Sequence, residues 1–175
     1  MRRIWYSVAM SLDGFIAGPN GEYDWIPHEP EIDWSAFLSR FDTALMGRRT
    51  YEASLNAPGG STLPAMKTYV FSRTLQTAAR PDITVVRTAI PEALAALREL
   101  PGKDIWLFGG GDLFRSILAL DQVDYVEVGL VPILLGRGIP LLPVSDRKIP
   151  LRLTDTRRYP SGITLLTYAV ETSPS

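Results

Sequence analysis

The sequence predicts a three-layer α/β/α domain, in which helices cover both faces of a mostly parallel sheet that has an antiparallel edge at its C-terminal end. Short apolar runs alternate with segments of helical periodicity up to about residue 120. The remaining third of the chain shows strand patterns instead. A length of 175 residues, with 46% hydrophobic and 21% charged residues, fits one globular domain over residues 1–175.

The first strand is expected over residues 4–10, and a turn follows at residues 11–14 before a short apolar run. The next residues form a loop long enough to be a lid or binding loop. Apolar residues then recur at helical spacing, which predicts a helix over residues 34–41 with Asp33 as its N-cap.

Three short strands are expected next, over residues 43–46, 67–71 and 83–86. Gly47, Arg48 and Arg49 follow the first of them at the predicted start of a helix, where guanidinium groups and free N–H groups can both face a phosphate. Ser72 and Arg73 follow the second strand, and Arg87 follows the third. The alternative for each arginine is an ordinary solvated charge.

Pro91 opens a helix that carries leucines on one face and ends before Pro101. Residues 105–108 then form an apolar strand, and Gly109, Gly110 and Gly111 lead directly into an amphipathic helix. Because these glycines have no side chains, an anion can approach their backbone N–H groups at the positive end of the helix dipole. The alternative is a sharp turn that only packs the strand closely on the helix.

The C-terminal third is mainly β-structure. A strand is expected over residues 123–130, followed by an apolar connection punctuated by glycine. Strands over residues 151–156 and 163–170 flank a turn at residues 159–162, which predicts a hairpin. The apolar segment 130–143 could form a homodimer interface or pack on the rest of the chain.

Four turns with features that favour anion binding therefore follow four strands. Ligands of parallel sheets bind at the carboxyl ends of the strands. Arginine and a hydroxyl suit a phosphate monoester better than a ribose hydroxyl. No motif places a ribose-binding carboxylate after a glycine turn. A dinucleotide bound here is therefore expected to be NADPH rather than NADH.

The composition argues against several other classes of function. A net charge of −1 provides no overall electrostatic attraction for nucleic acid or anionic membranes. The chain has no cysteine and a single histidine, His28, so no metal site is expected. The start resembles that of a cytoplasmic protein, and no apolar run reaches the about 18 residues of a membrane span.

These motifs, in this order, resemble the dihydrofolate reductase-like superfamily, and more closely its branch with the reductase domain of bacterial riboflavin biosynthesis. The resemblance extends from about residue 4 to residue 170. The matching segments are residues 11–17 (SLDGFIA), 46–52 (MGRRTYE), 108–111 (FGGG) and 130–138 (LVPILLGRG).

The resemblance implies a reductase that takes hydride from NADPH, and it implies a role for residues along the whole site. Those that would border the nicotinamide are Ala9, Ile16 and Ala17. Those that would hold the phosphates and ribose are Gly47, Arg48, Arg49 and Thr50, while Ser72 and Arg73 would meet the 2′-phosphate. Those that would wrap the pyrophosphate are Gly109, Gly110, Gly111, Asp112 and Leu113. We expect the Asp112 carboxylate to cap backbone N–H groups instead of contacting phosphate.

On the substrate side, folate reductases carry an acid in the helix before the segment that resembles MGRRTYE. In this sequence that acid corresponds to Glu31 or Asp33. The resemblance implies a small heterocyclic or sugar-derived substrate. The nearest named reaction is the reduction of 5-amino-6-(5-phosphoribosylamino)uracil. Two alternatives remain open from the sequence: a dihydrofolate reductase, and a nucleotide-binding protein without turnover.

Overall fold

The computed structural model describes the whole chain except residues 57–65, 77–81, 88, 145–146 and 172–175. No helix within the described ranges is long and apolar enough to cross a membrane. The strands are β1 (Ile4–Ser11), β2 (Phe15–Ala17), β3 (Phe41–Gly47), β4 (Lys67–Phe71), β5 (Ile83–Val86), β6 (Asp104–Gly109), β7 (Tyr125–Val131), β8 (Ile139–Pro140), β9 (Leu151–Arg158) and β10 (Thr164–Val170). The helices are α1 (Trp34–Ser39), α2 (Arg48–Leu55), α3 (Ile90–Glu99) and α4 (Gly111–Leu118).

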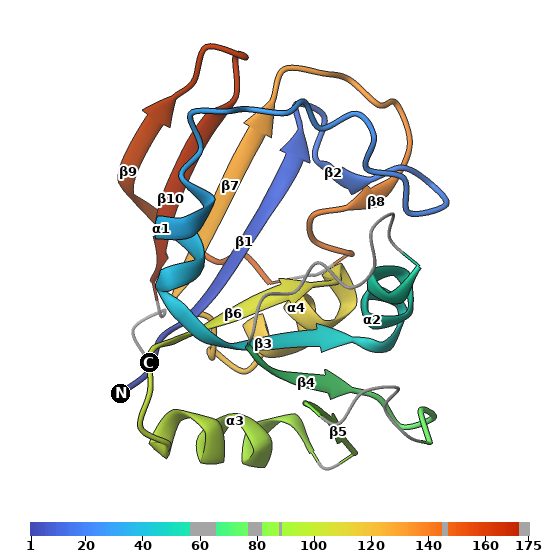
Figure 1. Cartoon of the computed structure of the whole chain (residues 1–175), viewed down its shortest axis with the longest axis vertical. Helices are drawn as coiled ribbons and strands as arrows, with labels where there is room; N and C mark the ends of the chain where they lie inside the picture. The colour runs from blue at the N-terminus through green and yellow to red at the C-terminus, as the bar shows by residue number, and fades with distance from the viewer. Residues whose placement is uncertain (57–65, 77–81, 88, 145–146, 172–175) are drawn as a thin grey trace.

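The central sheet has eight strands in the order β5-β4-β3-β6-β1-β7-β10-β9 (Figure 1). The six strands from β5 to β7 run parallel to one another, and β10 and β9 are antiparallel at one edge. This arrangement confirms the predicted fold class. The carboxyl ends of the six parallel strands consequently lie together, along the edge of the sheet that is formed by strand ends rather than by an outer strand.

Helices cover both faces of this sheet. Leu94 and Leu97 of α3, together with Phe114 and Ile117 of α4, pack in the main core on one face. On the other face, Phe37 of α1 packs against Trp106, and Tyr51 of α2 lies in a cluster with Met46. The alternating directions of side chains along the strands supply both faces with apolar groups.

Two helices end earlier than predicted. Phe41 was expected on the face of the helix that begins at Trp34, but the helix ends at Ser39 and Phe41 begins β3, where it pairs with Asp104. Leu100 was expected on the apolar face of α3, but it is the C-cap with extended backbone and is 45% exposed. In both cases the apolar spacing continues beyond the point where the backbone leaves the helix.

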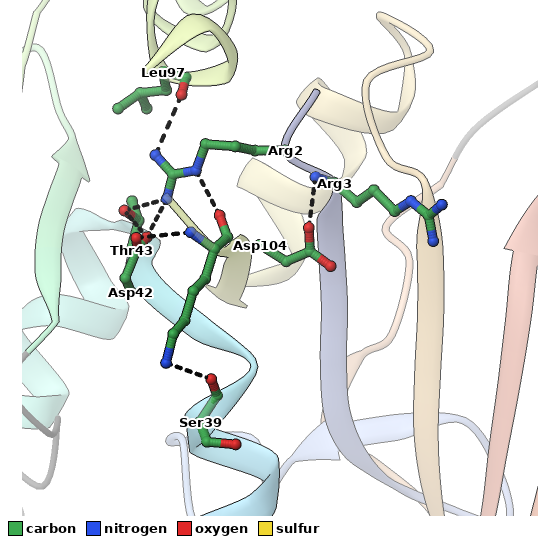
Figure 2. Close-up of polar contacts among 8 residues, drawn as sticks. Arg2, Arg3, Ser39, Asp42, Thr43, Leu97 and Asp104 are labelled. Carbon is green, nitrogen blue, oxygen red and sulfur yellow. Dashed lines mark hydrogen bonds and ion pairs between the residues drawn. The ribbon is translucent and has the colours of Figure 1, made fainter. Parts of the chain in front are cut away.

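The amino edge of the sheet is held by the buried side chain of Arg2 (Figure 2). Its guanidinium donates to the carbonyl oxygens of Lys103 (2.6 Å) and Leu97 (3.3 Å). It also donates to the carboxylate of Asp42 and to the hydroxyl of Thr43. Arg2 therefore ties the start of β1 to β3, α3 and the turn before β6. These contacts satisfy the guanidinium within the chain.

The apolar connection after β7 packs largely on its own chain. Leu141 and Leu142 lie against the main core, and Ile133 packs in a smaller cluster around Val131. Leu134, in contrast, is 69% exposed. The internal packing supports the second of the two readings of this segment, and the homodimer stays a prediction that light scattering would test.

Candidate functional site

The turns singled out in the sequence all follow neighbouring strands of the sheet. Gly47, at the end of β3, is paired with Phe71, at the end of β4. Phe71 is paired with Val86 of β5, and Met46 is paired with Gly109 of β6. Because these four strands are adjacent and parallel, the turns after them emerge side by side at the same edge.

Two helices begin at this edge within contact distance of each other. Gly47 is the N-cap of α2 and Gly110 is the N-cap of α4, and neither helix has a side-chain cap. A Cβ atom added to Gly47 would lie 4.0 Å from the backbone nitrogen of Gly110. By contrast, α1 is capped by the Asp33 carboxylate, which accepts from the Ala36 N–H at 2.8 Å. The first-turn N–H groups of α2 and α4 thus point to a common region without a capping side chain.

The glycine turn between β6 and α4 is tightly packed. Gly109 has a φ of 145°, which favours glycine, and the peptide bond between Gly109 and Gly110 is cis. A Cβ atom at Gly110 would lie 3.1 Å from the hydroxyl oxygen of Thr50. A Cβ atom at Gly111 would lie 3.2 Å from the carbonyl oxygen of Pro140. Close packing therefore explains Gly111, as the alternative interpretation held, whereas Gly110 faces the start of α2.

The residues present fit the phosphates of a dinucleotide. The first helical hydrogen bond of α4 runs from the Phe114 N–H to the Gly110 oxygen, at 3.0 Å. The N–H groups of Gly111, Asp112 and Leu113 precede that bond and belong to the unpaired first turn. An anion placed between the two helix starts would meet donors from both helices, with favourable helix dipoles.

The prediction that Asp112 caps backbone N–H groups is wrong. The N-cap position belongs to Gly110, and Asp112 is already inside the first turn of α4. Its carboxylate lies 3.8 Å from Arg115, one turn along the helix, and both side chains are exposed. The carboxylate still interacts favourably with the positive end of the helix dipole.

The arginines differ in how firmly the chain holds them. Arg48 lies 3.8 Å from Glu52 in an exposed pair, and Arg49 is also exposed. Arg73 is exposed and makes no hydrogen bond or ion pair with the part of the chain that the structure describes. Arg87 instead donates to the carbonyl oxygens of Leu75 (2.8 Å) and Gln76. Arg87 thus holds the turn after β4 in place.

Ser72 organises the turn in which Arg73 lies. Its hydroxyl oxygen accepts from the N–H groups of Thr74 (3.2 Å) and Leu75 (3.0 Å). Its own N–H donates to the Val86 oxygen at 3.1 Å. The turn after β4 is therefore joined to the end of β5, and its fixed shape presents the Arg73 side chain at the edge.

The residues expected near the nicotinamide lie at the ends of β1 and β2. Ala9 is half-buried and packs in the cluster that includes Trp25, Ile133 and Leu165. Ile16 and Ala17 are half-buried in β2, which pairs with β8. Trp25, from the loop before α1, packs against the same buried cluster as Ala9, which no spacing rule along the sequence could indicate.

The candidate acids are less well placed than the cofactor residues. Glu31 and Asp33 are both exposed, and Asp33 is occupied as the cap of α1. Nearby Glu29 is only 4% exposed and accepts from the N–H groups of Ser161 and Glu31, each at 3.0 Å. Hydrogen bonding by Ser161 and then by the Glu31 N–H lowers the pKa of Glu29. Glu29 therefore joins this loop to the β9–β10 turn.

Sequence reasoning missed a partly buried ion pair on the sheet face that carries Ala9. Glu127 of β7 is 5% exposed and accepts from Arg40 at 3.1 Å and from the Ser7 hydroxyl at 2.9 Å. The Arg40 guanidinium also lies 4.3 Å from the centre of the Trp5 ring. Ser7 is two residues before Ala9 in β1, so this polar cluster occupies the neighbouring row of the same face.

Comparison with known proteins shows the family to which the chain belongs. The model of the RibD C-terminal domain matches residues 2–165. The chain belongs to the RibD C-terminal domain family. Among relatives, it is 34% identical over 183 residues to the "Uncharacterized protein YyaP" of Bacillus subtilis (strain 168), covering 95% of this chain and 94% of that protein.

Solved structures related to this RibD C-terminal domain protein share its fold. A putative riboflavin biosynthesis protein from Shewanella sp. PV-4 superposes with a TM-score of 0.84 and 25% identity, covering 98% of this chain and all of that one. A dihydrofolate reductase from Enterococcus faecalis, complexed with NADP(H) and RAB-propyl, superposes with a TM-score of 0.73 and 20% identity, over 97% of each chain. The chain thus has the fold of the dihydrofolate reductase-like superfamily.

Proposed function

We propose that this protein is an NADPH-dependent reductase that transfers hydride to a C=N or C=O bond of a small heterocyclic or sugar-derived substrate. The observation that carries the proposal is the meeting of two helix starts without side-chain caps, flanked by turns that carry arginines. Membership of the RibD C-terminal domain family and the reductase among its fold neighbours support the same activity.

In this proposal each turn holds one part of the cofactor. The first-turn N–H groups of α2 and α4 bind the pyrophosphate, with Thr50 beside Gly109 and Gly110. The exposed side chain of Arg73 and the Ser72 turn bind the 2′-phosphate, and Arg48 and Arg49 add positive charge. Ala9, Ile16 and Ala17 border the nicotinamide, which supplies the hydride when the cofactor is bound.

The protein's own contribution is to align the substrate and to exclude water. The sheet face around Ala9 is bounded by Trp25 from the loop and by the Arg40–Glu127 pair in the neighbouring row. Glu31 and Asp33 are the proposed proton donors, and reduction of 5-amino-6-(5-phosphoribosylamino)uracil is the nearest named reaction. The capping bond of Asp33 favours Glu31 between the two.

The choice of cofactor is tested by titrating NADPH and NADH into the wild type and the Arg73→Ala variant. We expect the variant to bind NADPH at least about tenfold more weakly while NADH binding stays within about twofold, because only NADPH carries the 2′-phosphate. Arg152→Ala is the matched control. Arg152 is an exposed arginine on β9, the outer strand farthest from β4 and β5 in the order of the sheet. Equal losses for the two nucleotides would contradict the role of Arg73.

Turnover is tested on the protein saturated with NADPH. Oxidation of NADPH is followed with 5-amino-6-(5-phosphoribosylamino)uracil, with dihydrofolate and with a panel of small imines and carbonyl compounds. We expect oxidation with at least one heterocyclic substrate and a lower kcat for Glu31→Gln. Tight NADPH binding without oxidation by any substrate would instead indicate a nucleotide-binding protein without turnover.

A further inference from the structure

The turn between β1 and β2 is built around the carboxylate of Asp13. This carboxylate accepts from the Ser11 hydroxyl at 2.6 Å. The Ser11 hydroxyl oxygen in turn accepts from the Phe15 N–H at 3.0 Å, at the first residue of β2. Gly14 has a φ of 90°, which allows the chain to turn back within three residues. Asp13 therefore sits at the point where the chain enters β2.

The same carboxylate binds a distant segment, residues 133–143, which we call the strap. Asp13 accepts from the N–H groups of Leu135 (3.1 Å) and Gly136 (2.7 Å), 122 and 123 residues along the chain. Two successive N–H groups that converge on one anion form a small anion-binding nest, and here a side chain of the protein fills it. Hydrogen bonding from Ser11, and then from Gly136 and Leu135, lowers the pKa of Asp13 and keeps it ionised.

Main-chain contacts continue this attachment along the strap. The Leu12 N–H donates to the Ile133 oxygen at 2.8 Å, and the Leu141 N–H donates to the Gly14 oxygen at 2.9 Å. Between these points β8 of the strap pairs with β2, as Figure 1 shows at the upper right. A Cβ atom at Gly138 would lie only 2.2 Å from the Ala17 oxygen, so the two backbones are in close contact.

The far end of the strap lies on the start of α4. The carbonyl oxygens of Pro140 and Leu141 would be 3.2 Å and 3.5 Å from a Cβ atom at Gly111, and the Pro143 ring would be 3.2 Å away. The strap therefore leaves little room for a side chain at Gly111 and lies directly beside the first residue of α4. The strap joins β2, at one end of the candidate cofactor site, to the glycine turn at the other.

We propose that Asp13 is a positioning residue, which through the strap sets the separation between β2 and the glycine turn at Gly110 and Gly111. The proposal rests on the proposed function, in which β2 borders the nicotinamide and the glycine turn binds the pyrophosphate. Asp13 touches neither group. Its carboxylate fixes the strap, and the strap fixes the distance over which the cofactor must extend.

The first test is hydrogen exchange on the ligand-free full chain. In Asp13→Asn, an NH₂ group replaces one acceptor oxygen and opposes the N–H donors of the strap. We expect at least about tenfold faster exchange at the Leu141 N–H, bonded to Gly14, and at the Phe114 N–H, bonded to Gly110. Faster exchange at Leu141 alone would overturn the proposal, because the strap would then not act on α4.

Two further variants guard this test. Asp104→Asn is the matched control, because the Asp104 carboxylate also accepts from a backbone N–H and a side chain, those of Arg3 and Trp5, at the amino edge. It should leave Leu141 and Phe114 unchanged. Ser11→Ala removes the hydroxyl that donates to Asp13 and accepts from the Phe15 N–H. It should speed exchange at the same two N–H groups by a smaller factor, and it replaces Asp13→Asn in the test if that variant folds poorly.

The second test compares NADPH with adenosine 2′,5′-bisphosphate, which carries the 2′-phosphate and the 5′-phosphate but lacks the nicotinamide half of the cofactor. Asp13→Asn should weaken NADPH binding by about tenfold and the bisphosphate by less than about twofold, because only NADPH spans both ends. Equal losses, or none, would overturn the proposal. If the wild type binds neither ligand, the proposed function fails, while the exchange experiment still decides whether Asp13 controls the position of α4.

Discussion

Tyr6 carries a buried hydroxyl that has no hydrogen-bond partner among the described residues. Its ring is fully buried and stacks on Phe114 at a centroid distance of 3.9 Å. Burial raises the pKa of Tyr6, so the phenol stays neutral. We expect Tyr6→Phe to keep or increase the free energy of unfolding, by up to about 1 kcal/mol, because an unpaired polar group is removed. Chemical denaturation checks this, and a clear loss of stability would show that the hydroxyl has a partner.

Removing one partner of the Arg40–Glu127 ion pair should, in contrast, destabilise the protein. Arg40→Met leaves the Glu127 carboxylate buried with fewer donors, so we expect the free energy of unfolding to fall by about 2–3 kcal/mol. The double variant Arg40→Met, Glu127→Gln should recover most of this loss, because no uncompensated charge remains. A double-mutant cycle by urea denaturation measures the coupling, and additive losses would contradict it.

A substitution at Gly47 tests whether the start of α2 binds NADPH. The nearest atoms to a Cβ at Gly47 lie 3.9 Å and 4.0 Å away, so Gly47→Ala fits the ligand-free fold. We expect its stability to fall by no more than about 1 kcal/mol, the cost of alanine at an N-cap, while NADPH binding weakens by about tenfold, because the methyl group enters the region between the helix starts. Unchanged NADPH affinity in Gly47→Ala would contradict the site.

The loop before α1 depends on Glu29 in a pH-dependent way. Since its folded pKa is lowered below 4.5, the stabilisation it provides is present above that pH and is lost as the pH falls through the folded pKa. The stability difference between wild type and Glu29→Gln should therefore shrink under acid conditions. Denaturation at a series of pH values measures it, and a difference that stays constant with pH would contradict the role of Glu29.

At the scale of the whole molecule, local patterns predicted the parallel sheet, the hairpin and the four turns at one edge. Each turn follows its own strand within a few residues, so spacing along the sequence was sufficient. Arg40 and Glu127 are 87 residues apart, and Asp13 is 122 residues from Leu135, so their contacts arise only when the sheet assembles. Asp112 was misassigned because the backbone of Gly110 took the cap position.

We infer that the turns after three neighbouring strands, β3, β4 and β6, together bind one NADPH molecule. The most direct measurement is residue-resolved hydrogen exchange with and without NADPH. We expect slower exchange at residues 47–50, 72–75 and 109–113, and no change around Arg2 and residues 101–104 at the amino edge. Saturating NADPH that left all three turns unchanged, or that slowed exchange at the amino edge instead, would contradict it.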